Sequence, residues 1–295
     1  MNRNIKAVCF GEVLWDIFPD RKTLGGAPLN VALGMHAMGI DTQVVSKVGK
    51  DSLGTEIYEY LHQQGISPLL IKQCSDYPTG QVQVNLNEEG SATYEIISPV
   101  AWDQITLDSG IKSAVQQADV FVFGSLAARN EVSKKTLFQL LELATFSVFD
   151  VNLRPPYYTP ELLIRLIKKA SFIKFNDDEL LEIAQYMGSD FKTLNQNIHY
   201  VASKSNTSQL CVTRGEHGAI YYDHGTIYSH SGFQIEVADS VGAGDAFLAG
   251  LITQLMQKKS PLYILEFACA MGALVAKHHG ANPKISIQDV LQIRS

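Results

Sequence analysis

Short apolar runs and longer amphipathic segments alternate along this chain. The apolar runs have the length and composition of buried strands in a parallel sheet. They lie at residues 7–10, 42–48, 120–123, 147–149, 172–175 and 210–213. Segments with helical apolar spacing lie between most of them, at residues 29–38, 53–64, 134–144, 160–170, 178–186 and 191–203. This alternation predicts an α/β fold, with a central, mostly parallel sheet and helices on both of its faces.

One region breaks the alternation. Residues 79–86 and 91–97 alternate apolar and polar positions, and residues 87–90 between them form a good hairpin turn sequence. The hairpin is either an edge of the main sheet or a small antiparallel lid over a site, and periodicity leaves both open. The last third is more helical, with apolar spacing at residues 246–257, 262–277 and 287–293. Without repeats or flexible linkers, residues 1–295 are expected to form a single domain.

Composition and charge narrow the function classes. Hydrophobic residues make up 46% of the chain and charged residues 18%, as in ordinary globular proteins. The formal net charge of −6 argues against general binding to nucleic acid or to a membrane surface. No stretch reaches the ~18 apolar residues of a membrane span, and the first apolar run is too short for a secretory signal, so we expect a cytoplasmic protein. The four cysteines are widely separated, which favours buried, reduced thiols over a zinc or disulfide site.

The strongest chemical signal is a loop with two glycines at residues 239–245, directly before an apolar helical segment. Small residues let backbone N–H groups approach a ligand, and a helix N-terminus adds partial positive charge. This arrangement suits a phosphate, or a transition state over which negative charge spreads. Asp245, where the loop meets the helix, either caps the helix or takes part in chemistry, and spacing alone allows both. The chain has neither a Walker-type loop nor GxGxxG after its first strand, which disfavours P-loop and dinucleotide-binding proteins.

Six motifs, taken together and in order, resemble the ribokinase-like carbohydrate kinase family. They lie at residues 25–32, 48–54, 150–155, 176–179, 212–218 and 239–245. The resemblance covers essentially the whole chain. The stretches at residues 11–19, 24–30 and 101–103 are most similar to those of bacterial fructokinases. The resemblance implies a ribokinase-like fold with a small antiparallel β lid, drawn from roughly residues 12–23 and 79–98, that closes over bound sugar.

The resemblance also implies catalytic roles for the glycine loop. The backbone N–H groups of Gly242, Ala243 and Gly244 would form an anion hole for the transferring phosphoryl group. Asp245 would accept the proton of the attacking sugar hydroxyl, the task of a general base. Asp239 would help to bind a monovalent cation beside the hole, with K⁺ as the implied ion.

A second set of residues is implied to bind the sugar and the transferred phosphate. These residues are Asp16, Gly25, Gly26, Asn30, Asn152 and Arg154. The carboxylate of Asp16 would accept from sugar hydroxyls, and the Asn30 amide can both donate and accept. The planar fork of Arg154 suits a phosphate. Purely structural roles remain the alternatives: a solvent-facing loop aspartate, a helix-capping turn and a surface ion pair.

A third set is implied to bind the nucleotide. Asn176, Thr213, Gly215 and Gly218 would lie along ATP, and Glu179 would act on Mg²⁺ through bound water, since magnesium takes few carboxylates and several waters. The alternatives are a strand-to-hairpin turn and a solvated helix face. In many relatives the lid pairs with a second subunit, so a homodimer is a further hypothesis.

These observations predict an ATP-dependent sugar kinase, with D-fructose as the first expected substrate and fructose 6-phosphate as the product. Ser240 stands where the family more often has Thr, and Leu53 where it often has Phe, and neither change removes a chemical group that the reaction needs. A 2-keto-3-deoxygluconate kinase and a ribokinase are the alternatives within the family. A non-catalytic sugar or nucleotide sensor and a nicotinamide or flavin oxidoreductase are the alternatives from other classes.

Overall fold

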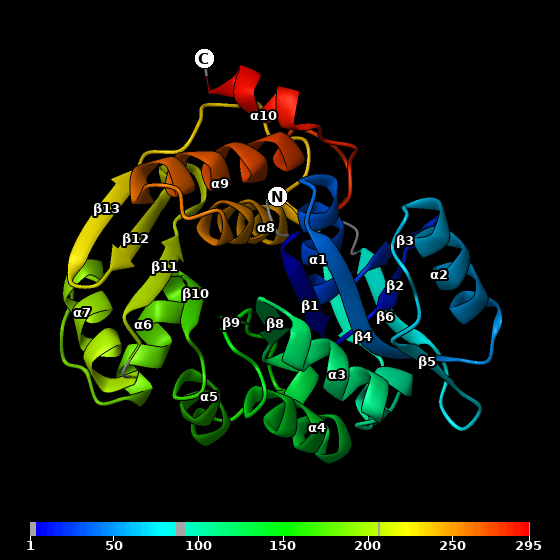
Figure 1. Ribbon diagram of the computed structural model, residues 1–295. Coiled ribbons are helices and arrows are strands. Elements are labelled where there is room, and N and C mark those ends of the chain that lie inside the picture. Colours follow the sequence, from blue (N-terminus) through cyan, green and yellow to red (C-terminus); the bar gives the residue numbers. More distant parts are fainter. Residues whose placement is uncertain (1–3, 87–91, 206, 295) are drawn as a thin grey trace.

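The main sheet is nine-stranded in the computed structural model, which describes residues 4–86, 92–205 and 207–294. Its order is β13-β12-β11-β10-β9-β8-β1-β4-β5 (Figure 1). The bounds are β1 Lys6–Phe10, β4 Asp41–Gly49, β5 Ile71–Cys74, β8 Val120–Gly124, β9 Ser147–Asp150, β10 Phe172–Asn176, β11 Gln209–Thr213, β12 Ala219–Asp223 and β13 Thr226–His230. All pairings from β11 to β5 are parallel, and β12 and β13 add an antiparallel edge. The mostly parallel sheet is as predicted.

Helices cover both faces of this sheet, as predicted. Their bounds are α1 Ala27–Ala37, α2 Ser52–Gln63, α3 Ser109–Gln117, α4 Glu131–Leu141, α5 Pro160–Ile167, α6 Asp177–Tyr186, α7 Leu194–Ser205, α8 Ala243–Met256, α9 Pro261–Ala276 and α10 Ile287–Ile293. In β1, Ala7 and Cys9 belong to the core shared with α1, α8 and α9, whereas Val8 and Phe10 belong to the core shared with α3 to α7 (Figure 1). Both faces of the strand are therefore buried, which explains why the strands are continuous apolar runs.

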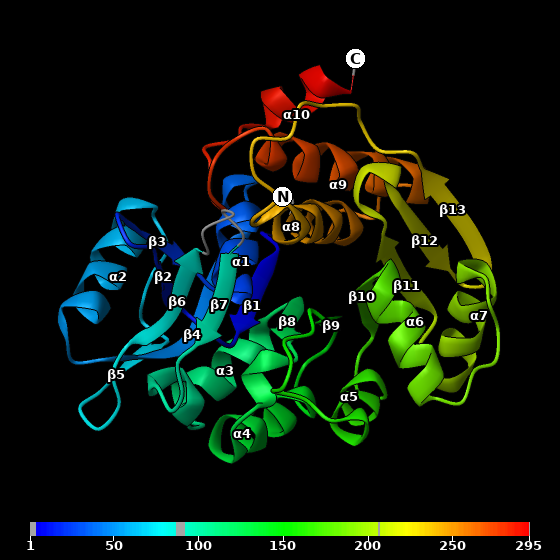
Figure 2. The same cartoon turned by 180° about the vertical axis from the view of Figure 1, so that it is seen from behind.

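A second, four-stranded sheet stands beside the first. It has the order β3-β2-β6-β7, with bounds β2 Leu14–Ile17, β3 Lys22–Gly25, β6 Gly80–Leu86 and β7 Ala92–Ile96. Two of its pairings are antiparallel, and β2 pairs with β6 in parallel. Figure 2 shows β6 and β7 from their open side. The hairpin thus belongs to a separate small sheet, which we call the lid; its expected turn at residues 87–90 lies outside the described residues.

Several elements were not predicted from the sequence. These are β5, β12, β13 and α3, whereas β2 and β3 come from the segment that the resemblance assigned to the lid. The strands among them are short and mix polar with apolar positions, so they depend on pairing with their neighbours rather than on a clear period. Helix α1 begins at Ala27 instead of residue 29, because a proline such as Pro28 fits the first turn of a helix.

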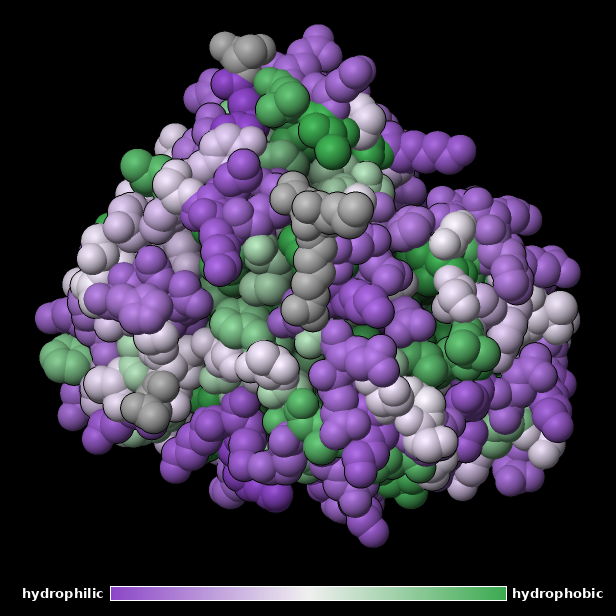
Figure 3. Space-filling model, viewed as in Figure 1, coloured by the Kyte–Doolittle hydropathy of each residue, from purple (hydrophilic) through white to green (hydrophobic). Residues whose placement is uncertain are grey.

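The surface is largely hydrophilic in the view of Figure 3. Hydrophobic surface is divided into separate patches, one of them over α10, where Ile287 and Leu291 are exposed (Figure 3). All four cysteines are buried and free, as predicted. Within the described ranges, no helix combines the length and the apolar character needed to cross a bilayer.

A buried ion pair joins the lid to the main body. The guanidinium of Arg129 donates to both carboxylate oxygens of Asp103, at 2.7 and 2.8 Å, and to the carbonyl of Ile97 just after β7, at 2.9 Å. Its Cζ lies 3.9 Å from the ring centroid of Trp102. The side chains of Arg129 and Asp103 are only 3% and 0% exposed. A buried carboxylate of this kind depends on its partner, because the bare charge would be poorly solvated.

We expect Arg129→Ala to lower the free energy of unfolding by about 3–5 kcal/mol, because Asp103 would remain buried without its partner. Lys169→Ala is the matched control. It removes the partner of Glu142 in a pair whose side chains are 44% and 63% exposed, and such pairs contribute less than about 1 kcal/mol. Urea unfolding of both variants measures the difference. Equal, small losses would contradict a special role for the buried pair.

Candidate active site

The carboxyl ends of the parallel strands and the N-termini of α1 and α8 meet at one edge of the main sheet. Asn30 in α1 donates from Nδ2 to Oδ2 of Asp245 in α8, at 2.8 Å. Lys174 in β10 donates to Oδ1 of Asp150 at the end of β9, at 2.9 Å. In open α/β sheets, ligands bind at this edge. The structure therefore gathers residues from distant motifs into one candidate site.

The loop before α8 turns sharply at a glycine that no other residue could replace. Gly242 caps the helix in the left-handed region, with φ of 77°, and a Cβ built there would lie 2.5 Å from Cα of Ala281. No side chain larger than a hydrogen fits this position. Ala243 and Gly244 follow in the first turn of α8, where backbone N–H groups have no partner within the helix, although the Ala243 N–H donates to the Ser240 carbonyl at 3.3 Å. Gly244 is exposed, so this turn is open to a ligand.

Asp245 does not occupy the cap position of α8. Gly242 does, and the Asp245 carboxylate accepts from Asn30 instead. Loss of hydration raises the pKa of Asp245 to about 6, and the Asp150 carboxylate adds to this rise. The hydrogen bond from Asn30 and the charges of Lys174 and Arg154 act in the opposite direction. The result is a carboxylate that is ionised at neutral pH yet close to its titration range, as suits a general base.

Lys174 was not identified as a site residue from the sequence. Its ammonium group is buried, with the side chain 8% exposed, and a Cβ on Gly244 would lie 3.6 Å from its Nζ. Burial opposes its charge, but Asp150, Glu179 and Asp245 together hold its pKa above the ordinary value. The signal was present in the sequence: a lysine inside an otherwise apolar strand must have a charged partner.

Glu12 is a second residue that the sequence did not identify. It follows β1, is 4% exposed, and its Oε2 makes no hydrogen bond within the described structure. Burial raises its pKa to about 7, against smaller effects from its own backbone and from Arg154. The negative charge of Asp245 raises this pKa further, so ionisation of Glu12 is affected by that of Asp245.

The residues predicted to bind sugar lie together between the lid and α1. Asp16 is in β2, and its Oδ2 would lie 2.7 Å from a Cβ on Gly25. Gly26, the residue before α1, has φ of 109°, and a Cβ there would lie 2.4 Å from the Glu12 carbonyl oxygen. Burial raises the pKa of Asp16 to about 6, opposed by the charge of Arg154. The close packing thus brings Gly25 against the Asp16 carboxylate and Gly26 against the backbone of Glu12.

Asn152 and Arg154 follow β9 and approach the same region. Asn152 has a positive φ of 38°, which is uncommon for a residue with a side chain and bends the chain after the strand. Arg154 is exposed, and its charge lowers the pKa of Glu12, Asp16 and Asp245. The guanidinium is therefore near all three carboxyls and remains accessible to a ligand.

The predicted nucleotide residues have structural partners. Asn176 caps α6 by accepting from the N–H of Glu179, at 2.7 Å. The Glu179 carboxylate accepts from the N–H groups of Asn176 and Leu153, both at 2.8 Å. Thr213 donates to the carbonyl of Phe175 at 3.3 Å. These bonds orient the ends of β10 and β11, so Asn176 and Thr213 have structural roles alongside any contact with a nucleotide. The alternative of a solvated helix face is wrong for Glu179, which is 7% exposed and accepts two backbone hydrogen bonds.

Two predicted glycines and Asp239 lie in loops. Gly215 and Gly218 form the turn between β11 and β12, with φ of 53° and 77°. Asp239 accepts from the N–H groups of Val241 and Gly280, both at 3.0 Å. It thereby ties the glycine loop to the segment after α9.

The Glu12 carboxyl gives a testable effect of pH on stability. Its pKa rises from the ordinary 4.5 to about 7 on folding, so the folded state binds this proton more tightly, and the carboxyl increasingly destabilises the fold as pH rises from about 4.5 to 7. We expect Glu12→Gln to be more stable than the parent by roughly 3 kcal/mol above that range and by little below it. Urea unfolding across pH measures this. A difference that does not change with pH would contradict it.

Comparisons with known proteins identify the family of this chain. The model of the pfkB family carbohydrate kinases matches residues 6–288. The fructokinase of Escherichia coli is 26% identical over 97% of this chain and 98% of its own length, and that of Solanum tuberosum is 29% identical over 94% and 92%.

Solved structures share the fold. Fructokinase from Xylella fastidiosa with bound ATP has a TM-score of 0.87 and 24% identity, covering 98% of this chain and 97% of that one. Aminoimidazole riboside kinase from Salmonella enterica, complexed with aminoimidazole riboside and an ATP analogue, has a TM-score of 0.82 and 21% identity, covering 98% and 100%. The predicted resemblance to ribokinase-like carbohydrate kinases is confirmed. From its fold and the nearly full-length match, the chain belongs to the pfkB family of carbohydrate kinases, which are phosphotransferases with an alcohol group as acceptor.

Proposed function

We propose that this kinase transfers the γ-phosphoryl group of ATP to D-fructose, with Asp245 as the general base and fructose 6-phosphate as the product. The observation that carries the proposal is the Asp245 carboxylate, held by Asn30 at the open N-terminus of α8. One end of the site offers backbone N–H groups for phosphate, and the same turn carries a base for the attacking hydroxyl. Phosphoryl transfer needs mainly these two things: positioning and stabilisation of charge.

The proposed reaction uses each group once. The sugar hydroxyl loses its proton to Asp245 as its oxygen bonds to the γ-phosphorus. The bond from that phosphorus to the bridging oxygen breaks, and ADP leaves with the electron pair. The N–H groups of Gly242, Ala243 and Gly244 receive the spreading negative charge, aided by the helix dipole and by Lys174 beneath the loop.

Sugar binding is proposed for the residues that the lid and α1 bring together. Asp16 accepts from hydroxyls, Asn30 presents its amide beside Asp245, and the chain at Gly25 and Gly26 permits close approach. Asn152 and Arg154 complete the set from the chain after β9, with Arg154 proposed to bind the transferred phosphate. Movement of the lid over the sugar would exclude water and limit hydrolysis of ATP.

Asn176, Thr213, Gly215 and Gly218 are proposed to lie along the nucleotide. Among the described residues, no group of three or more His, Cys, Asp or Glu side chains forms a metal cage. The residues fit a hydrated ion instead: Asp150 Oδ2 is buried without a hydrogen bond, and the charges of Asp150 and Glu179 both act on Lys174. Water-bridged Mg²⁺, held by these carboxyls and the phosphates, would supply positive charge to the nucleotide.

The remaining proposals concern assembly and ions. Asp239, at the base of the glycine loop, is proposed to help bind K⁺. Residues 1–295 are proposed to act as one domain, in which the lid pairs with that of a second copy. An enzyme that consumes ATP works where ATP is supplied, and we propose the cytoplasm.

Fructose is favoured over other sugars by the comparisons. Fructokinases recur among the relatives that match nearly the full chain. A riboside kinase shares the fold, so 2-keto-3-deoxygluconate kinase and ribokinase remain the alternatives within the family. A non-catalytic sugar or nucleotide sensor is the alternative from another class, and the complete loop with Asp245 disfavours it.

The first test is release of ADP from Mg-ATP with fructose, ribose, 2-keto-3-deoxygluconate, glucose, tagatose and adenosine. We expect strong turnover with fructose, and a fall in kcat of at least about 10²–10⁴-fold for Asp245→Asn, because the base is removed. Asp190→Asn, on an exposed loop, is the control for loss of a carboxylate. Turnover with another sugar alone would replace the substrate, and full activity of Asp245→Asn would remove the proposed base.

The pH profile gives a second test. Asp245 and Asp16 each have a pKa of about 6, raised by burial. Asp245 must be ionised to accept a proton, and Asp16 must be ionised to accept hydrogen bonds from sugar hydroxyls through both oxygens. We therefore expect kcat/KM for the sugar to fall as pH decreases through about 6. At saturating sugar, kcat should follow Asp245 alone. Rates that stay constant through this range would contradict the assignment of Asp245.

A further inference from the structure

We propose that Asn282 is a positioning residue for phosphoryl transfer, because it holds the Asn30 amide in the one orientation that donates to Asp245. This role rests on the proposed function of Asp245 as the base. Asn282 lies after α9, in a segment that none of the sequence motifs covers. It makes no direct contact with the reacting atoms and would act through Asn30 alone.

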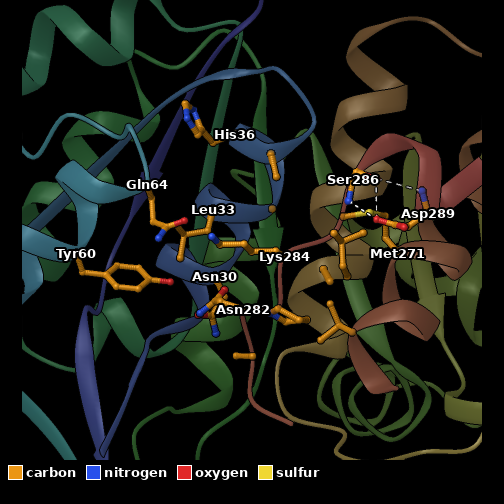
Figure 4. Close-up of a pocket in the computed structure, with 17 residues that line it drawn as sticks. Asn30, Leu33, His36, Tyr60, Gln64, Met271, Asn282, Lys284, Ser286 and Asp289 are labelled. Carbon is orange, nitrogen blue, oxygen red and sulfur yellow. Dashed lines mark hydrogen bonds between the residues drawn. The ribbon is translucent and has the colours of Figure 1, made fainter. Parts of the chain in front are cut away.

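The contacts form a chain of three side chains. Asn282 donates from Nδ2 to Oδ1 of Asn30 at 2.8 Å, and Asn30 donates from Nδ2 to Oδ2 of Asp245, also at 2.8 Å. Asn30 is 7% exposed, so both ends of its amide are held away from water. Figure 4 shows Asn30 and Asn282 side by side on one wall of a cavity.

The orientation of the Asn30 amide decides what Asp245 receives. A half-turn of the amide would exchange its oxygen and nitrogen and place an oxygen against the Asp245 carboxylate. With the donor of Asn282 on the other side, only the observed orientation satisfies both neighbours. The hydrogen bond from Asn282 thus disfavours the turned orientation of the Asn30 amide. Holding the amide in one orientation costs little ordering, because the amide is already enclosed.

The charges around Asp245 make its pKa sensitive to this contact. Asp150 from β9 opposes ionisation, whereas Lys174 from β10 and Arg154 favour it. Glu12, in the loop after β1, is the other carboxyl nearby, and its own pKa is raised by Asp245. The hydrogen bond from Asn30 also favours the ionised form of Asp245. Loss of that donor should therefore raise the pKa of Asp245 and leave less of the base ionised near neutral pH.

The other side of Asn282 faces open space. A cavity of about 350 Å³ lies behind it, bounded by α1, α2, α9 and the segment before α10. Leu33, Tyr60, Gln64 and Lys284 are among its lining residues (Figure 4). A substitution at Asn282 therefore disturbs little packing, and the variants can be expected to fold.

Asn282→Asp is the sharpest test because it keeps the shape and replaces the donor with an acceptor. The Asn30 amide should then turn toward the new carboxylate. We expect the acid limb of kcat to move up by at least about half a pH unit, and kcat on the limb to fall by at least about threefold, with little change in KM for ATP. Asn282→Ala should shift the limb in the same direction by less, and Asn282→Gln, with the cavity to accommodate it, should restore most of kcat.

Lys284→Ala is the matched control. It makes the same change of net charge in the same segment, on an exposed side chain outside the hydrogen-bonded chain. A shift as large as that of Asn282→Asp would reduce the effect to bare charge and overturn the proposal. An unchanged limb in both Asn282→Asp and Asn282→Ala would also overturn it, while Asp245→Asn remains inactive. Full activity of Asp245→Asn would instead overturn the base assignment, so the two failures are distinguishable.

Discussion

The carboxylates at one edge of the main sheet depend on the positive charge of the buried Lys174 ammonium group. The carboxyl ends of the parallel strands lie at one edge of the sheet. Asp150, at the end of β9, and Glu179, in the helix after β10, lie there close to Asp245. Like charges at this proximity would repel one another and favour protonation. The ammonium group of Lys174, in β10, compensates the negative charges of all three carboxylates, and its pKa remains high despite its burial. Under the proposed function, Lys174 would keep the base ionised while the phosphates of a nucleotide bind.

The fold and the glycine loop could be predicted because their signals are local. Apolar runs report buried strands, and a glycine at position 242 reports the left-handed turn before α8. The rest is not local. Asn282 meets Asn30 across 252 positions, and no spacing rule joins the two. Lys174 was missed because a single charged residue did not disturb the apolar pattern of its strand. A lysine buried in a strand needs a charged partner, and this requirement could have identified it.

Several residues proposed to bind ligands also have structural partners. Asn176 and Glu179 form a capping box that starts α6, and Asp239 binds the glycine loop to the segment at Gly280. A capping residue at the end of a strand is held rigidly at the edge where ligands bind, so the cap itself orients the site. The sequence left both a structural and a functional role open for these residues, and their structural contacts are compatible with both roles.

The contact between Asn30 and Asp245 joins positions 215 residues apart, and Asn282 extends the chain of contacts almost to the end of the sequence. No early portion of the polypeptide can carry the site, because its halves meet only when the last helices have packed onto the first. Contacts of such long range form late and slowly. Kinase activity would then appear at the final step of folding, and its recovery during refolding would report the completion of the whole domain rather than of any one part.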